Sequence, residues 1–446
     1  MPLVDSWVKK WFPQQKSGRK LSTRRLKLEA LEDRCLLTYA ITDLGTLPNY
    51  PTSLGAALNA SGQVTGTVNA GQGTYRAFLY SDGKISDMGL PDQLPSWGNG
   101  INDSGQVAGF IYGRAFLYSD GTIADLGTLG GTRAAAVGIN NTGNVVGWAM
   151  TADEYIHAFF YSDGRMLALE DLPGGNGGFA NGINDSDQVT GYAFGAGFVH
   201  ATIWDQGKIT DLGTLPGDDF STGNAINASG QVVGDSTLLN AGTGEQHAFL
   251  YSKGTMTDLG TLGGRLSHAS GINTSGQVVG YSSLPPPMTY ADHAFLYNDG
   301  TMTDLNSLID PNSGWVLYQA TAINDAGQIV GDGLNPQGDV HAFLLSPESE
   351  PLKQDEALVL HDPGVVRVQV SWFAPSKSEY STVASTPGES LVANPHTGEI
   401  HGERPLPGSA KFWLEASGLR ALAARSTNAG SASNWFDPLG ANSPLS

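Results

Sequence analysis

Five histidines in this chain occupy the same local sequence, directly before an alanine that opens an Ala-Phe or Ala-Thr pair. They are His157, His200, His247, His293 and His341, and in two further copies Arg76 and Arg114 stand at this place. Histidine is a common metal ligand and general base, so five in one motif suggest a metal or catalytic centre. Each histidine belongs to a different copy of a repeat, however, and equivalent residues of successive repeats are spread along a fold. We therefore predict no metal site here.

An aspartate recurs in the same copies and offers these residues a structural partner. In the hairpin that the sequence predicts, His293 and Asp304 share one face as diagonal neighbours, a separation at which side chains interact. We interpret these His or Arg and Asp positions as hydrogen-bonded pairs that fix the end of a loop. The recurring aspartates are Asp43, Asp87, Asp125, Asp171, Asp211, Asp258 and Asp304.

Other chemistry has little support in the sequence. Asp-Gly and Asn-x-x-Gly segments resemble calcium loops, but each offers one or two carboxylates where calcium takes six to eight oxygens, so turn formation explains them. We expect no cofactor, with calcium at Asp218-Asp219 as the open exception. HExxH, GxSxG and phosphate-binding glycine motifs are absent. Gly234-Asp235-Ser236 resembles the start of an esterase motif, but Gly234 is a recurring glycine of the repeat. A pair of carboxylates that meets only in space stays an open alternative.

The repeat itself returns every 40 to 50 residues or so, the range of propellers and solenoids. Each copy holds an Asn-x-x-Gly turn, an apolar strand that ends in glycine, an Ala-Phe strand, a two-residue hairpin turn and an Asp-Leu strand. The turn asparagines are Asn59, Asn102, Asn140, Asn184, Asn227, Asn273 and Asn324. The strand-ending glycines are Gly66, Gly109, Gly147, Gly191, Gly234, Gly280 and Gly331.

The Asp-Leu strand is missing after the last copy, and an extra one precedes the first. The extra segment is ITDLGTL, residues 41–47. A strand supplied by the N-terminal end to complete the last copy closes a ring and leaves no open sheet edge. We therefore predict an all-β fold over residues 39–346, a seven-bladed β-propeller of four-stranded antiparallel blades closed by an N-terminal strand. An open β-solenoid is the alternative.

The turn lengths predict two different faces of this ring. The Asn-x-x-Gly turns and the two-residue hairpins are short and constant, whereas the connections on the opposite face vary in length. Binding residues are usually carried on such irregular loops. The aromatic residues that the sequence places there are Trp97, Trp148, Tyr155, Tyr192, Tyr290 and Trp315, our candidate ligand-binding residues.

Composition agrees with a turn-rich β protein and disfavours nucleic acid as a partner. The 446 residues include 59 glycines, only 15% are charged, and the net charge is −19. Residues 1–38 hold nine basic and four acidic residues, so the other 15 basic and 39 acidic residues give −24. Phosphate binding requires a basic surface. The chain has a single cysteine, Cys35, and no apolar run of transmembrane length.

The two ends fall outside the repeat. Residues 1–38 read as a basic leader, and Leu28 to Leu37, LEALEDRCLL, resembles the LExLExRxLL leader of exported surface proteins, which implies export. Residues 347–364 read as a linker, 365–425 as a small C-terminal appendage and 426–446 as a disordered tail. Within the appendage the patterns predict a strand at 365–373 and a helix at 410–425.

The repeat as a whole resembles a known family. His157-Ala158-Phe159, His247-Ala248-Phe249, His293-Ala294-Phe295 and His341-Ala342-Phe343, with their Gly-Ile-Asn-x-x-Gly-Gln-Val-Val-Gly and Asp-Leu-Gly-Thr-Leu segments, resemble the HAF repeat of extracellular bacterial proteins. The resemblance implies an exported propeller-like protein and no catalytic residues. Arg76, Arg114, Thr202 and Asp187 depart from the pattern.

These observations lead to two functional hypotheses. We expect a non-enzymatic extracellular or cell-surface scaffold that binds a polysaccharide or a protein through its variable loops. The alternative is an extracellular polysaccharide lyase or hydrolase whose site lies at the mouth of the propeller channel. Convergent carboxylate, histidine or tyrosine side chains with shifted pKa values would favour the enzyme.

Overall fold

The computed structural model describes residues 39–348, except 72, 92–93, 239–244 and 287–291, and five short strands between residues 381 and 425. The chain divides into two compact units, Met1–Ser349 and Glu350–Ser446. The leader at 1–38, most of the linker, the strand at 365–373 and the tail at 426–446 lie outside the described residues. No helix of the described part is long and apolar enough to cross a membrane.

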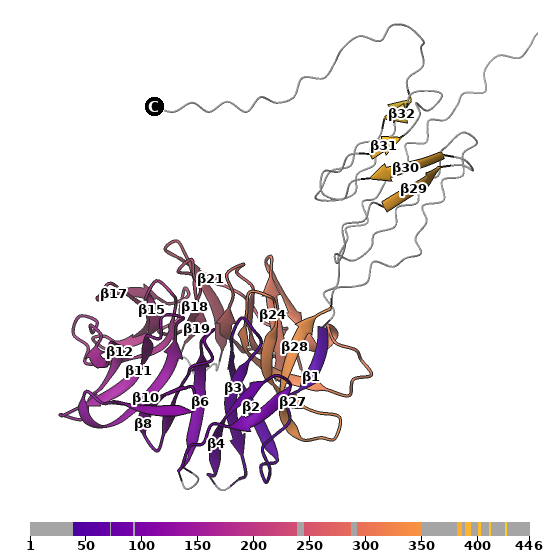
Figure 1. The fold of residues 1–446 in the computed structure, drawn as a ribbon. Coiled ribbons are helices and arrows are strands. Elements are labelled where there is room, and N and C mark those ends of the chain that lie inside the picture. Colours follow the sequence, from indigo (N-terminus) through magenta and orange to yellow (C-terminus); the bar gives the residue numbers. More distant parts are fainter. Residues whose placement is uncertain are drawn as a thin grey trace, which may run out of the picture. The chain divides into compact units, whose positions relative to one another are not determined.

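The first unit is built from seven four-stranded antiparallel sheets, which we call blades 1 to 7 (Figure 1). Blades 4 and 5 are joined into one sheet by a single parallel pair, Val199 and Phe220. Blade 1 contains β2 (Thr52–Leu58), β3 (Val64–Asn69), β4 (Tyr75–Ser81) and β5 (Lys84–Asp87). Blade 2 contains β6 (Ser96–Ile101), β7 (Val107–Ile111), β8 (Arg114–Ser119) and β9 (Thr122–Gly127). Blade 3 contains β10 (Gly130–Ile139), β11 (Val145–Thr151), β12 (Ile156–Ser162) and β13 (Arg165–Ala168). Blade 4 contains β14 (Gly178–Ile183), β15 (Val189–Phe194), β16 (Val199–Asp205) and β17 (Lys208–Gly213). Blade 5 contains β18 (Phe220–Ile226), β19 (Val232–Thr237), β20 (Gln246–Ser252) and β21 (Thr255–Asp258). Blade 6 contains β22 (Ser267–Ile272), β23 (Val278–Ser283), β24 (Asp292–Asn298) and β25 (Thr301–Asp304).

Blade 7 takes its outer strand from the beginning of the described chain. It consists of β26 (Val316–Ile323), β27 (Ile329–Leu334), β28 (Val340–Pro347) and β1 (Tyr39–Asp43). Strand β1 pairs antiparallel with β28, from Tyr39 opposite Pro347 to Asp43 opposite Phe343. In Figure 1 the indigo β1 lies beside the orange β28. The innermost strands contact one another around the ring, and β26 contacts β2. The chain is therefore a closed β-propeller, as predicted, and the solenoid alternative is wrong.

A cycle of seven hydrogen bonds joins the blades at the Asn-x-x-Gly turns. In each blade the Nδ2 of the turn asparagine donates to the backbone carbonyl of the next turn asparagine, at 3.0 to 3.2 Å, and Asn324 donates to Asn59. These asparagines are buried. Their Oδ1 atoms accept the backbone N–H four residues later, as in Asn227 with Gln231. The recurring asparagine thus forms its own turn and also ties that turn to the next blade.

Blade 4 departs from this turn, and its neighbour compensates. In five of the other six blades the turn glycine lies against a glutamine of the preceding blade: a Cβ on Gly105 would be 3.3 Å from Oε1 of Gln63. At Asp187, where φ is 59°, that neighbour is Asn144, which is one methylene shorter than glutamine. The Oδ1 of Asp187 accepts hydrogen bonds of 2.8 Å from Asn144 and from Asn140. The shorter side chain therefore makes room for the carboxylate.

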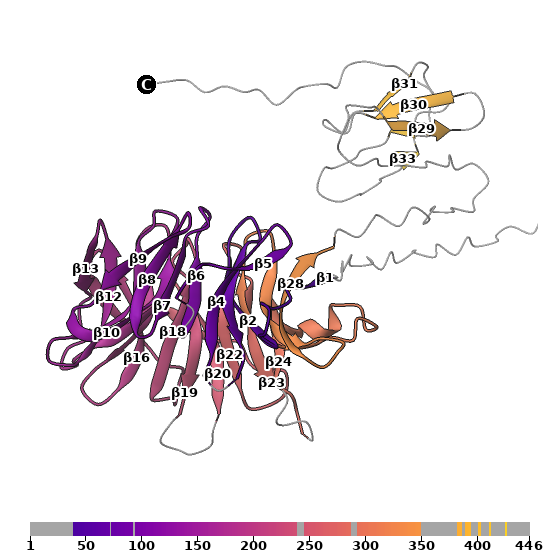
Figure 2. The same ribbon diagram turned by 60° about the horizontal axis from the view of Figure 1, so that its bottom comes forward.

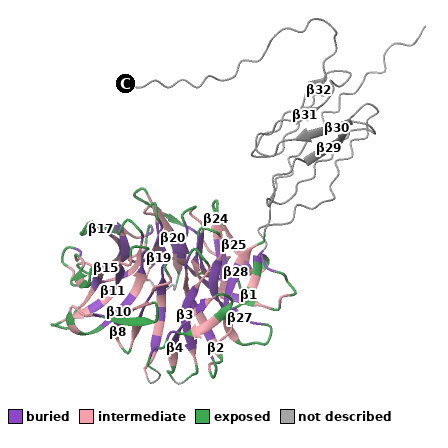
Figure 3. Ribbon diagram, in the orientation of Figure 1, coloured by how far each residue is buried: buried purple, intermediate pink, exposed green. Residues whose placement is uncertain are grey.

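The core lies between the blades, as Figure 3 shows by the buried residues along the strands and the exposed ones at the turns. Six blades bury the phenylalanine of the Ala-Phe pair, and blade 4 has Thr202 there. Trp204, two residues further on the same strand face, is 2% exposed, and its Nε1 donates to the carbonyl of Glu170 at 2.7 Å. We infer that the large side chain of Trp204 allows blade 4 to have the smaller Thr202 in place of the phenylalanine. The six phenylalanines are Phe78, Phe116, Phe159, Phe249, Phe295 and Phe343.

Thr202→Val is expected to stabilise the propeller by about 1 kcal/mol, because the buried Oγ1 of Thr202 has no hydrogen-bond partner among the described residues. Valine keeps the shape and removes the desolvated hydroxyl. Urea unfolding of the two proteins measures the difference. Thr190→Val is the control, because its hydroxyl donates to the carbonyl of Thr202 at 3.0 Å and its loss should destabilise. A less stable Thr202→Val variant would contradict the prediction.

The second unit is described only by its strands. Strands β29 (Ser381–Ser385), β30 (Glu389–Ala393) and β31 (Ile400–Gly402) form a three-stranded antiparallel sheet. Strands β32 (Ala410–Lys411) and β33 (Ala424–Arg425) pair with each other. The helix predicted at 410–425 is therefore wrong at both of its ends. The apolar spacing of that segment carries no strand signal, and the pairing joins residues 13 and 15 positions apart.

Candidate functional site

The connectivity of the blades separates two faces of the ring. Because neighbouring strands are antiparallel, the turns from first to second and from third to fourth strand share one side, which we call the turn face. The loops from second to third strand and the connections to the next blade lie on the opposite side, which we call the variable face. The variable face is the lower side of the ring in Figure 2.

The structure brings together all seven His or Arg and Asp pairs at the outer part of the variable face. The nitrogen–oxygen distances are 2.5 to 3.1 Å. His341 pairs with Asp43, so one pair also joins the closing strand to blade 7. The pairs are Arg76–Asp87, Arg114–Asp125, His157–Asp171, His200–Asp211, His247–Asp258, His293–Asp304 and His341–Asp43.

The aspartates of these pairs also hold the backbone that follows them. In six blades the carboxylate accepts a hydrogen bond of 2.7 or 2.8 Å from the N–H two residues later, as in Asp258 with Gly260. In these six blades the pair therefore fixes the point at which the chain leaves its outer strand. Within the described residues, no three histidine, cysteine, aspartate or glutamate side chains gather where a metal ion could bind, Asp218 and Asp219 included.

The six candidate aromatic residues fall into different environments. Tyr155 is 49% exposed, Trp315 packs against the core with its ring edge-on to Phe343, and Tyr290 lies outside the described residues. Trp97, Trp148 and Tyr192 were predicted on loops, but they lie within strands β6, β11 and β15. The strands extend beyond the recurring glycine toward the variable face, which the loop prediction did not allow for.

These three residues belong to a set of seven cross-strand pairs, one per blade, that we call the belt. Each pair joins the residue five positions before the turn asparagine, on the first strand, to the residue after the recurring glycine, on the second. Both side chains of a pair lie on one face of the blade, near the variable face. The pairs are Leu54–Thr67, Trp97–Phe110, Ala135–Trp148, Phe179–Tyr192, Thr222–Asp235, His268–Tyr281 and Gln319–Asp332.

A bulge in every first strand sets the geometry of the belt. The register shifts just after the belt residue, for example between Ala180 and Gly182 in blade 4. This presses the carbonyl oxygen of the belt residue against the glycine of the second strand, where an added Cβ would lie 1.8 to 2.1 Å from that oxygen in all seven blades. The scaffold positions are thus the same in every blade, whereas the belt side chains differ.

Blades 2 to 4 carry the aromatic part of the belt. Trp97 stacks on Phe110 with ring centroids 4.4 Å apart, and Phe179 stacks on Tyr192 at 4.9 Å. Trp148 of blade 3 lies 6.0 Å from Phe179 of blade 4, so the aromatic surface crosses a blade boundary. These rings are partly buried, and burial raises the pKa of Tyr192. Such surfaces suit apolar ligand faces and sugar rings.

Blades 5 and 6 carry a hydrogen-bonded polar cluster. The buried carboxylate of Asp235 accepts hydrogen bonds from Thr222 at 2.9 Å and from Asn224 at 3.1 Å, and its Oδ1 lies 2.8 Å from Nδ1 of His268. The imidazole of His268 stacks on Tyr281, with centroids 5.0 Å apart. Burial, followed by the charges of Asp235 and Asp292, raises the pKa of Tyr281.

Blade 7 holds a second carboxylate at the same position. Asp332 is 6% exposed, and its Oδ1 accepts a hydrogen bond of 2.8 Å from Gln319. Burial raises the pKa of Asp332 to about 6, against the lowering effect of Gln319. Because the pKa of Asp332 is higher in the folded than in the unfolded protein, the folded protein loses stability as the pH rises from about 4 through 6. At neutral pH the free energy of unfolding is lower by about 3 kcal/mol for this reason.

Sequence reasoning missed the charged members of the belt. The sequence explains Asp235 only as the residue after a recurring glycine, and it gives no functional prediction for His268 or Asp332. One signal was available: the residue after the recurring glycine is Thr, Phe, Trp, Tyr, Asp, Tyr and Asp in the seven copies, amid neighbours that hardly change. A variable position between constant ones marks a side chain that the fold does not dictate.

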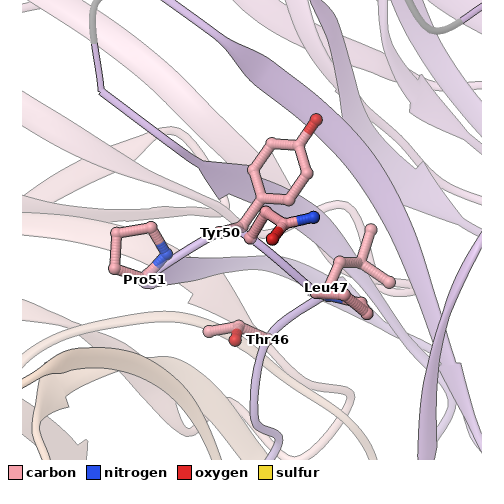
Figure 4. A pocket seen from close by; sticks show the side chains of 6 residues that line it. Thr46, Leu47, Tyr50 and Pro51 are labelled. Atoms are coloured by element: carbon pink, nitrogen blue, oxygen red, sulfur yellow. The ribbon is translucent and has the colours of Figure 1, made fainter.

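A surface depression lies elsewhere on the variable face, in the connection from β1 to β2. It has a volume of about 560 Å³ and is lined by one continuous segment, Thr46 to Pro51, between β1 and β2 (Figure 4). It is open and shallow, and no titratable side chain other than Tyr50 contributes to it. We therefore take the belt, with its stacked aromatic and hydrogen-bonded polar side chains, as the candidate site.

Comparison with known proteins adds no family. No protein-family model and no curated protein matches the chain. Among solved structures it is similar to an oligogalacturonate lyase in complex with manganese, at 11% identity over 70% of this chain and 97% of that chain, with a TM-score of 0.48. It is also similar to YCF48 bound to a D1 peptide, at 12% identity over 71% of this chain and 96% of that chain, with a TM-score of 0.44. A gluconolactonase from Xanthomonas campestris is similar at 13% identity over 70% of this chain and 95% of that chain, with a TM-score of 0.35.

Proposed function

We propose that this chain is a non-enzymatic extracellular or cell-surface scaffold that binds a glycan with the belt on its variable face. The observation that carries the proposal is the contrast within each blade: turn asparagine, bulge and glycine recur, while the belt pair changes from copy to copy. A closed propeller that served only as a spacer would not need seven different pairs, two of which bury a carboxylate.

The chemistry of the belt favours a sugar over an extended apolar ligand. Aromatic side chains in blades 2 to 4 offer flat faces for pyranose rings, and the carboxylates, amides and imidazole of blades 5 to 7 offer hydrogen bonds to hydroxyl groups. The HAF-like repeat and the LExLExRxLL-like leader support an extracellular or surface location. A protein partner would be the other outcome of the binding test below.

Trp148→Ala is expected to weaken glycan binding at least tenfold, about 1.4 kcal/mol, because it removes a ring from the aromatic part of the belt. The measurement is isothermal titration calorimetry of the full chain with oligosaccharides such as cellotetraose, mannotetraose and chitotetraose. Tyr155→Ala is the matched control, because Tyr155 is exposed on the same face outside the belt and its loss should leave the affinity unchanged. Equal losses in both variants would place binding on the loops, and no binding of any glycan would refute the proposal.

An enzyme is the second candidate, favoured by two observations. Asp332 has the raised pKa expected of a general acid, and the Asp235–His268 pair, joined at 2.8 Å, is a carboxylate-oriented imidazole. A glycoside hydrolase or lyase would release new reducing ends or unsaturated products from a polysaccharide. Product formation that Asp332→Asn abolishes, with binding retained, would replace the scaffold proposal by this one.

A further inference from the structure

Two aspartates occupy the same belt position in different blades, and the structure treats them differently. Among the described residues, Asp235 of blade 5 accepts hydrogen bonds from two side chains, Thr222 and Asn224, and the imidazole of His268 in the next blade lies 2.8 Å from it. Asp332 of blade 7 accepts one side-chain hydrogen bond, from Gln319. The residue of the next blade that corresponds to His268 is Leu54, which offers no hydrogen bond. The two sites therefore form an internal comparison: within the described residues an imidazole lies beside Asp235, and no basic side chain lies beside Asp332.

The ring does not need a carboxylate at this position. The other blades fill it with threonine, phenylalanine, tryptophan or tyrosine, on the same bulged frame. Asp332 is more than nine-tenths buried, and no cationic side chain of the described residues lies within 4 Å of it. A buried carboxylate without a counter-charge is unfavourable and is expected only where something else supplies the partner.

We infer that Asp332, with Gln319 beside it, is the recognition site for a ligand's amino group, so that the glycan bound by the belt contains amino sugars with free amines. The inference rests on the proposed function and names its ligand class. The ammonium group would take the place beside Asp332 that the imidazole of His268 takes beside Asp235, and the carbonyl of the Gln319 amide can accept a second hydrogen bond from it.

The charge of the chain points in the same direction. Outside residues 1–38 the net charge is −24, so cationic ligands are attracted to this protein and anionic polysaccharides are repelled. A neutral sugar hydroxyl could also donate to Asp332, but it would leave the carboxylate charge uncompensated in a buried position. The comparison of free with acetylated amines separates these two cases.

The binding experiment compares chitotetraose with its fully deacetylated counterpart, a chitosan tetramer, by calorimetry on the full chain. We expect the deacetylated tetramer to bind at least tenfold more tightly, and Asp332→Asn to remove this preference. Asp299→Asn, the same change in an exposed hairpin turn on the turn face, should keep it. Equal affinities for the two tetramers, with glycan binding intact, would overturn this inference alone, and no glycan binding would overturn the proposed function as well.

A second measurement does not depend on any ligand. If Asp332 serves a ligand and not the fold, Asp332→Leu should raise the Tm of the free protein by a few degrees. Asp235→Leu should lower the Tm, because it removes the carboxylate that accepts hydrogen bonds from Thr222 and Asn224 and lies beside His268. A lower Tm for Asp332→Leu in a protein that still folds would show that Asp332 is structural, and would overturn the inference.

Discussion

Replacement of residues 39–43 by a glycine-serine segment of equal length is expected to lower the Tm of the propeller by about 10 °C. The change removes the outer strand of blade 7 together with Tyr39, which is only 3% exposed in the intact ring, and breaks the His341–Asp43 pair. Loss of the buried tyrosine and of the strand hydrogen bonds together amounts to about 5 kcal/mol, and each kcal/mol lowers the Tm of a domain of this size by about 2 °C.

The matched control is the same replacement in β21, the four-residue outer strand of blade 5. That strand does not join the two ends of the ring, so its loss should lower the Tm less and leave a single calorimetric transition. The β1 replacement should broaden the transition and, because the edge of β28 is then open, promote association that size-exclusion chromatography detects. Equal shifts and equal cooperativity for the two variants would mean that ring closure contributes nothing beyond one outer strand.

The fold could be predicted because its determinants are local and repeated. The Asp-Leu strand missing after Leu345 and the extra one around Asp43 specify how the ring closes, and no packing detail is needed to see it. The asparagine at each turn, such as Asn227, was likewise recognisable as a turn former. Its second role was not, because the bond from its amide to the carbonyl of Asn273 depends on the spacing between blades, which sequence spacing does not reveal.

The candidate site was harder to predict, because the belt is defined by a cross-strand register. Phe179 and Tyr192 stand 13 residues apart and become opposite neighbours only through the bulge after Phe179. The variable loop lengths predict that the binding residues lie on loops, whereas the side chains that differ between the blades lie within strands. The partners of Asp235 come from two blades, and the lack of a cationic partner near Asp332 is visible only when the next blade is in place.

Gly191→Ala is expected to destabilise the protein by about 3 kcal/mol or more. A Cβ on Gly191 would lie 1.9 Å from the carbonyl oxygen of Phe179 and 2.9 Å from the Cα of Ala180. Both are backbone atoms held by the bulge, so no rotamer change relieves the overlap, and strand β14 must move away from β15. Because Phe179 carries the aromatic part of the belt, we expect glycan affinity to fall together with stability. Equilibrium unfolding in urea and calorimetry measure the two effects.

Gly182→Ala in the same blade is the control that separates crowding from the general effect of adding a methyl group. Its Cβ would approach no atom closer than 3.3 Å, and the equivalent residues of blades 1, 5 and 7 are alanines, Ala57, Ala225 and Ala322. We expect a change within about 1 kcal/mol for this variant. If Gly191→Ala were equally mild, the carbonyl of Phe179 could shift freely, and the bulge would not be what holds the belt residues in register.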